Sequence, residues 1–84
     1  MIYKQFIWHI DDKYVAVFPE LHPIDITVGE DKDEVRRQSK VKAIIQLREM
    51  PEMPPNLSIV EAFALVDELP QEDLISASAI DLTV

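Results

Sequence analysis

The stretch from Tyr14 to Val35 reads Y-V-A-V-F-P-E-L-H-P-I-D-I-T-V-G-E-D-K-D-E-V, and it decides the fold. Its first residues, 14–18, are apolar and point alternately to the two faces of an extended chain. Pro19 follows them; it lacks a backbone donor and ends regular strand pairing. A second alternating run covers residues 24–28, and Gly29 then precedes an acidic segment that is typical of a helix start. The stretch therefore predicts a strand, a second strand and a helix, in that order.

The residues before this stretch predict one more strand. Residues 2–10 alternate so that one face of an extended chain is mostly apolar, and Asp11-Asp12-Lys13 has the composition of a turn. We therefore expect strands at residues 2–10 and 14–18 to form a hairpin, with residues 24–28 as the third strand.

The first helix has a recognisable start and end. Asp31 and Glu34 have the spacing of a capping box, in which each side chain binds the backbone amide of the other residue. The chain then lacks glycine and proline as far as Glu49, and the proline-rich segment 50–55 ends the helix.

This helix is expected to be amphipathic, with one stripe against the core and a separate basic ridge in solvent. The predicted core stripe consists of Val41, Ile44, Ile45 and the stem of Arg48, and the ridge of Lys32, Arg36 and Lys40.

The last third of the chain predicts a short helix and a strand. Ser58 and Glu61 repeat the capping-box spacing ahead of an apolar run that stops before Pro70, and residues 74–84 read as a fourth strand. The predicted fold is α+β, in the order β-β-β-α-(short α)-β, with one mainly antiparallel sheet covered on one face by helices. We expect residues 1–84 to form a single domain.

Composition limits the possible functions. The chain has 84 residues, no cysteine and one glycine, which exclude disulfides, cysteine zinc sites and glycine-rich phosphate loops. It has neither the features of a signal peptide nor an apolar run long enough for a bilayer, so we expect a soluble, cytoplasmic protein without a membrane partner. The net charge is −8, and segment 49–84 carries eight acids and no base. Such a chain repels nucleic acid and attracts basic partners.

Several short motifs occur in an order that matches a known family. They are the aspartate-rich turn Asp11-Asp12, then Tyr14, Val17 and Pro19-Glu20-Leu21, then Thr27-Val28-Gly29-Glu30, the paired acids Asp33-Glu34, a later proline cluster, and Ile80-Asp81-Leu82 near the end. In this order the chain resembles the N-terminal domain of HicB-type antitoxins, which is a partial relative of the ribonuclease H fold. It departs from the family pattern at Lys13, where a glycine is common, and at His22-Pro23-Ile24 with an additional Asp25, where the family has proline-glycine-cysteine.

The resemblance implies a partner and no reaction. Antitoxins of this family mask a small basic ribonuclease toxin, HicA, and usually carry a DNA-binding domain that has no counterpart in this sequence, so we expect no direct DNA binding, no catalysis and no cofactor. Carboxylates on a rigid sheet can pair with the lysines and arginines that hold RNA. The candidate partner-binding residues are Asp11, Asp12, Phe18, Glu20, His22 and Asp25. For each of them, a purely structural role in a turn or in the core is the alternative.

Other functions remain open. The chain could be an acidic inhibitor or nucleic-acid mimic of some other nucleic-acid-binding protein, or a metal-dependent nuclease that uses Asp25, Glu30 and Asp31. His9 and His22 lack the spacing of metal ligands, and no metal site is expected. A small core and exposed sheet edges also predict a homodimer, formed through a sheet edge or a helix face.

Overall fold

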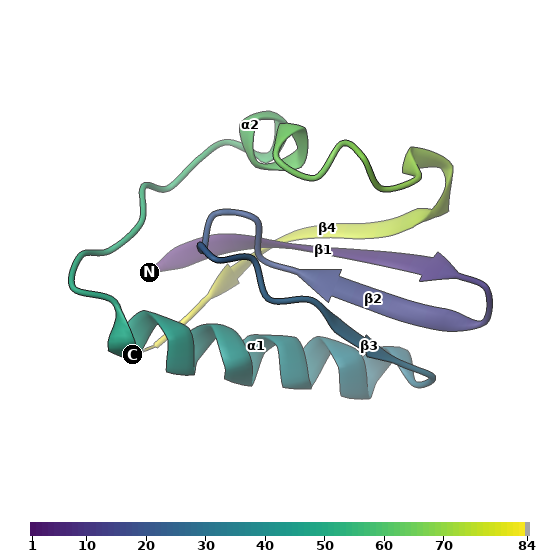
Figure 1. The fold of residues 1–84 in the computed structure, drawn as a ribbon, viewed down its shortest axis with the longest axis horizontal. Coiled ribbons are helices and arrows are strands. Elements are labelled where there is room, and N and C mark those ends of the chain that lie inside the picture. The colour runs from purple at the N-terminus through teal and green to yellow at the C-terminus, as the bar shows by residue number, and fades with distance from the viewer. Residues whose placement is uncertain (84) are drawn as a thin grey trace.

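One four-stranded antiparallel sheet organises the chain (Figure 1). The structure is a computed structural model that describes residues 1–83. Its strands are β1 (Ile2–Ile10), β2 (Lys13–Val17), β3 (Thr27–Gly29) and β4 (Leu74–Asp81), in the spatial order β3-β2-β1-β4. Its helices are α1 (Lys32–Glu49), α2 (Ile59–Ala64) and the single 3₁₀ turn η1 (Gln71–Asp73). The predicted α+β class and the order of the elements are confirmed.

The β1–β2 hairpin closes through a two-residue turn. Ile10 pairs with Lys13, which leaves Asp11 and Asp12 as the two central residues, with φ angles of 48° and 64°. Positive φ at both positions matches the right-handed twist of the hairpin, and aspartate tolerates this region better than most residues. The predicted turn is confirmed, and its geometry presents both carboxylates at the tip.

The third strand is shorter than predicted. Strand β2 ends at Val17, and β3 pairs only through residues 27–29, with Tyr14 opposite Gly29 and Ala16 opposite Thr27. Residues 24–26 form no strand and belong to the connection that leads from β2 to β3. The alternation of residues 24–28 thus indicated extended backbone, but strand pairing requires a partner, and β2 offers one only over three residues.

Helix α1 starts where its cap predicts. The Asp31 carboxylate accepts a hydrogen bond from the Glu34 amide at 3.0 Å, which is one half of the predicted capping box. The Glu34 side chain instead accepts hydrogen bonds from Arg37 and Gln38, and the bond from Arg37 lowers the pKa of Glu34. The helix ends at Glu49, immediately before the proline-rich connector.

The predicted core stripe of α1 is wrong. Val41 and Ile45 are 45% and 49% exposed, Arg48 is exposed, and only Ile44 of that stripe packs against the core. The buried face repeats at a spacing of four and consists of Val35, Ser39, Ala43 and Leu47. Serine and alanine contribute little to a hydrophobicity pattern, but small side chains allow the helix backbone to lie close to β2 and β3. The hydrophobicity pattern therefore assigned the core-facing side of the helix to larger side chains that lie next to the face that is buried.

The two helices cover opposite faces of the sheet (Figure 1), and in this respect the prediction of one covered face is corrected. Tyr3 of β1 packs in a cluster with Leu47 of α1, whereas Phe6 and Trp8 pack in a separate cluster with Ala62 of α2. Residues of opposite parity in a strand point to opposite faces. Strand β1 is therefore buried on both sides, which explains why apolar residues occur at both parities in its sequence.

The connector and α2 complete the second face. Ser58 and Glu61 form the predicted capping box in both directions, with each side chain accepting from the other residue's amide at 3.1 Å. The rings of Phe63 and Trp8 are stacked, and their centroids lie 6.5 Å apart. The chain then passes through η1 into β4, whose paired residues end at Asp81; residue 84 of the predicted strand lies outside the described residues.

Candidate partner-binding surface

Glu20 is a structural residue at the centre of a buried network. Its side chain is 0% exposed and accepts hydrogen bonds from the Lys4 amide at 2.5 Å and from the Leu57 amide at 2.7 Å. The Lys4 ammonium, whose side chain is 10% exposed, lies 3.4 Å from the same carboxylate and also binds Asn56 Oδ1. The carboxylate thus ties β1 to the connector between the helices and offers no surface to a partner.

Phe18 is also unavailable. Its ring is 4% exposed and belongs to the cluster that contains Leu21 and Leu47, beneath α1. The structural alternative that the sequence left open therefore describes both Phe18 and Glu20.

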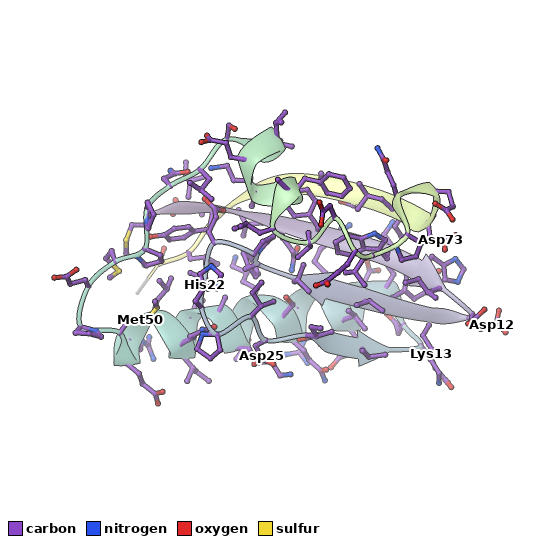
Figure 2. The ribbon with its side chains drawn as sticks, turned by 45° about the horizontal axis from the view of Figure 1, so that its top comes forward. Asp12, Lys13, His22, Asp25, Met50 and Asp73 are labelled. Atoms are coloured by element: carbon purple, nitrogen blue, oxygen red, sulfur yellow. The ribbon has the colours of Figure 1, made fainter. Side chains whose placement is uncertain are left out.

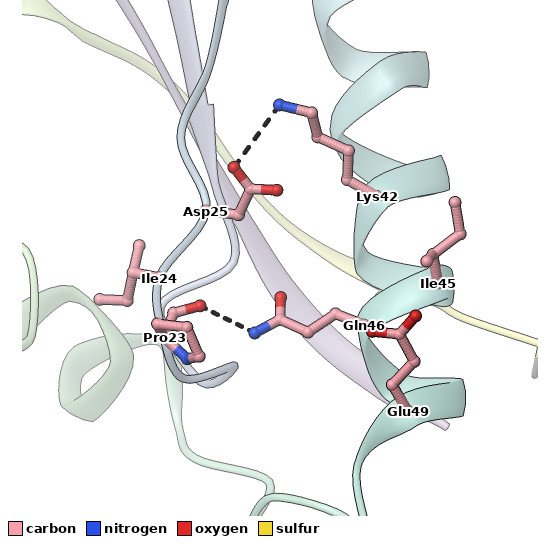
Figure 3. Close-up of a pocket in the computed structure, with 7 residues that line it drawn as sticks. All are labelled: Pro23, Ile24, Asp25, Lys42, Ile45, Gln46 and Glu49. Atoms are coloured by element: carbon pink, nitrogen blue, oxygen red, sulfur yellow. Dashed lines mark hydrogen bonds and ion pairs between the residues drawn. The ribbon is translucent and has the colours of Figure 1, made fainter.

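His22 and Asp25 are exposed in the loop that follows β2, beside the C-terminal half of α1 (Figure 2). An open groove of about 460 Å³ lies between this loop and the helix (Figure 3). Asp25 Oδ1 is 3.5 Å from Lys42 Nζ, and Gln46 Nε2 donates to the Pro23 carbonyl oxygen at 2.8 Å. These contacts fix the loop to α1, and Lys42 balances the charge of Asp25.

Asp12 lies at the opposite end from His22, at the hairpin tip (Figure 2), and Asp11 precedes it in the same turn. From Asp12 to Phe18 there are six steps of nearly extended chain, or roughly 20 Å. The six candidate residues therefore do not form one surface. The structure brings Asp11 and Asp12 together at the hairpin tip, places Asp25 in the α1 groove with His22 exposed in the same loop, and buries the other two.

The hairpin tip gathers further acids that the sequence did not connect with it. The β3–α1 turn and η1 lie at the same end of the molecule as the tip (Figure 1), and Figure 2 shows Asp73 on the same side as Asp12. Strand pairing explains the arrangement, because Trp8 pairs with Leu74 and Tyr14 pairs with Gly29. We call this region the acidic end; its carboxylates are Asp11, Asp12, Glu30, Asp31, Glu72 and Asp73.

The carboxylates of the acidic end are mostly uncompensated. Lys13 Nζ lies 2.7 Å from Glu30 Oε1, and within residues 1–83 this is the one ion pair that involves the acidic end. The side chains of His9 and Tyr14 stack beside the turn, with ring centroids 4.4 Å apart and planes within 6°. The acidic end thus combines negative charge with a flat pair of rings, of which the His9 side is exposed. Only the pairing of β4 with β1 could have connected Glu72 and Asp73 to this region.

Residues 1–83 contain no group of three or more histidine, cysteine or acidic side chains placed to hold a metal ion. Within the same residues, no helix has the length and apolarity needed to cross a bilayer.

Comparison of the chain with protein-family models, with curated proteins and with solved structures finds no match.

Proposed function

We propose that this chain is a non-catalytic cytoplasmic binding protein that neutralises a small basic ribonuclease, as the resemblance to HicB-type antitoxins implies. The observation that carries the proposal is the acidic end, where three separate connections bring together six carboxylates, five of them exposed and Asp73 half-buried, with a single ion pair between Lys13 and Glu30. A ribonuclease must present lysines and arginines to hold the phosphate backbone of RNA, and clustered carboxylates are the complement of such a surface.

The acidic end is suited to binding because the fold holds it in place. The hairpin turn fixes Asp11 and Asp12, and the Asp31 carboxylate is oriented by its bond to the Glu34 amide. A rigid array of charges loses little conformational entropy on binding, and it steers a basic partner before contact. The exposed ring of His9, stacked on Tyr14, supplies a flat surface for an arginine side chain.

The partner surface that we propose therefore keeps Asp11 and Asp12 from the sequence prediction. It replaces Phe18 and Glu20, which are buried, by the acids of the β3–α1 turn and of η1. His22 and Asp25 lie on a different part of the molecule and are not required by the proposal.

The test first asks whether the reading frame beside this chain encodes a short basic protein, whose absence would reject the antitoxin proposal, and then measures binding to that protein at several salt concentrations. The variants are Asp11→Asn with Asp12→Asn, which keep a turn-forming residue at both positions, and Glu72→Gln with Asp73→Asn. Each pair removes two charges, and we expect association to slow on the order of tenfold at low salt, since exposed charge pairs contribute about 0.2–1 kcal/mol each. The difference should shrink as salt rises, because screening shortens the reach of surface charges.

The matched control is Glu49→Gln with Glu52→Gln, which removes two exposed charges at the other end of α1. It should change association less than either acidic-end pair. An equal effect of the control would show that only the net charge matters and would reject the acidic end as the binding surface. Absence of binding to the basic protein would reject the antitoxin proposal, and an acidic inhibitor of another nucleic-acid-binding protein would then be the better hypothesis.

A further inference from the structure

The two edges of the sheet differ in length. Strand β3 forms one edge and has three residues, whereas β4 forms the other edge and has eight. An edge strand presents unpaired backbone donors and acceptors, and the number of these groups increases with its length. Any association through a sheet edge is therefore favoured at β4.

The register of β4 shows which backbone groups point outward. The Leu82 amide donates to the Met1 carbonyl at 2.7 Å, and Tyr3 pairs with Ile80 two residues further along. In an antiparallel pair, alternate residues direct both backbone groups toward the neighbouring strand. The even-numbered residues of this segment therefore bond to β1, and the amides and carbonyls of Ala77, Ala79 and Asp81 point away from the sheet.

From Leu74 to Ile80 the edge strand has none of the devices that block strand pairing, and its one charge, Asp81, lies at the end. Natural edge strands commonly carry lysine, proline or an inward-pointing charge. Residues 74–80 read L-I-S-A-S-A-I, without charge or proline. The one irregularity is a bulge between Ile7 and Trp8 of β1, which lies opposite the start of β4. From Ser76 to Ile80 the strand is regular, and four of its five side chains are serine or alanine, which permit close approach of another strand.

We propose that the β4 edge pairs with the β4 edge of a second copy of this chain, antiparallel, around a two-fold axis. A copy fits because small uncharged side chains occupy the middle of both edges, and the charge of Asp81 lies at the end of each strand, so no charge pattern selects a charged partner strand. Antiparallel pairing of a strand with itself is closed by the two-fold axis, so it covers both long edges and stops at a dimer.

Charge selects the register of this dimer. With Ala77 on the axis, Asp81 would lie opposite Asp73 of the second copy, and like charges in that position are destabilising. With Ala79 on the axis, Asp81 lies opposite Ala77 of the second copy and about 13 Å from its Asp73. The outward backbone groups of Ala77, Ala79 and Asp81 are then all paired. We therefore assign Ala79 to the two-fold axis.

The interface is small, so the dimer should be weak. Five residues of each copy pair in this register, and contacts of this size belong to the transient class, for which we expect a dissociation constant on the order of micromolar. Light scattering should show a mass of 9.7 kDa in dilute solution and a rise toward twice that value at about a hundredfold higher concentration.

Cysteine cross-linking tests the edge and the register together, because the chain contains no cysteine of its own. In the proposed dimer, the Cα atoms of the two Ala79 residues would lie about 5.5 Å apart, within the range that a disulfide spans. Under mild oxidation Ala79→Cys should form a covalent dimer, whereas Val28→Cys on β3 should remain monomeric. Rapid cross-linking of Val28→Cys in place of Ala79→Cys, or of neither variant, would overturn the proposal.

A proline variant provides a test without cross-linking. Ala79→Pro removes an amide that points to solvent, so the monomer should fold, as circular dichroism can check, while pairing with a second copy is blocked. The control variant is Val60→Lys, which changes an exposed residue of α2, away from β4. We expect Ala79→Pro to stay monomeric at concentrations where Val60→Lys dimerises. A dimer that survives Ala79→Pro would overturn the proposal, and neither result depends on the proposed ribonuclease partner.

Discussion

Replacement of Glu20 by alanine tests whether this residue is structural. The substitution removes the acceptor of two backbone amides, those of Lys4 and Leu57, and leaves the Lys4 ammonium without its buried counter-charge. A backbone donor that loses its partner in the interior costs about 1–3 kcal/mol. Removal of one partner from a buried ion pair costs about 3–5 kcal/mol in all, because the other charge stays buried. Native domains have about 5–15 kcal/mol of stability in total.

We therefore expect Glu20→Ala to lower the free energy of unfolding by about 3–5 kcal/mol. Lys4→Met also leaves one charge of the pair without its partner, but the Glu20 carboxylate would keep both amide donors, so the loss should be smaller. The difference between the two losses thus reports the contribution of the two backbone hydrogen bonds.

The assay is urea unfolding followed by tryptophan fluorescence. Trp8 is the single tryptophan and is fully buried, so its emission reports exposure of the core. The control is Glu30→Ala, which breaks the exposed pair with Lys13; the Glu30 side chain is 80% exposed and such pairs contribute about 1 kcal/mol or less. If Glu20→Ala loses no more stability than Glu30→Ala, the buried network does not hold the fold and the assignment of Glu20 is wrong.

Two further predictions concern the helices. Leu47→Ala should lower the free energy of unfolding by about 2–5 kcal/mol and Ile45→Ala by less than about 1 kcal/mol, since only Leu47 is fully buried; urea midpoints that rank the two variants in the opposite order would restore the stripe predicted from the sequence. Hydrogen bonds from the Ser58 backbone and side chain lower the pKa of Glu61 below its ordinary value of 4.5, so this group stabilises the fold above that pH and loses its contribution as the pH falls through the folded-state pKa. Glu61→Gln should therefore be less stable than the parent at pH 7, and this difference should shrink as the pH falls below 4.5; a difference that stays constant as the pH falls would contradict the proposed linkage.

Local signals in the sequence were sufficient for the element boundaries that depend on neighbouring residues. The caps at Asp31 and Ser58 act over three residues, and the prolines after Glu49 end α1 without help from the rest of the fold. These features were predicted because their causes lie within a few residues of their effects.

The rotation of α1 and the side of the sheet taken by α2 depend on packing between distant segments. Ala43 is buried in a cluster with Tyr3, Phe18 and Leu82, which come from segments far away in the sequence, and no hydrophobic pattern within the helix shows that. The burial of Glu20 also depends on a distant segment. Its residue type is typical of a turn, but it is buried by the connector that carries Asn56 and Leu57. Glu72 and Asp73 join the acids of the hairpin tip in one surface only because β4 pairs with β1. The candidate site was therefore the part of the protein that the sequence could predict least.

The geometry of the proposed dimer keeps the acidic ends apart. Strand β4 begins next to Asp73 at the acidic end and runs away from it, so antiparallel pairing directs the two acidic ends in opposite directions. With Ala79 on the axis, twelve residues of extended strand separate the two Asp73 residues, which corresponds to about 40 Å. This distance is several times the Debye length of roughly 8 Å at physiological ionic strength, so the strong negative charge of each copy does not oppose association there. Parallel pairing would instead place the two acidic ends side by side. The antiparallel arrangement thus leaves both acidic ends free, and a dimer could hold one basic partner at each end without the two partners meeting.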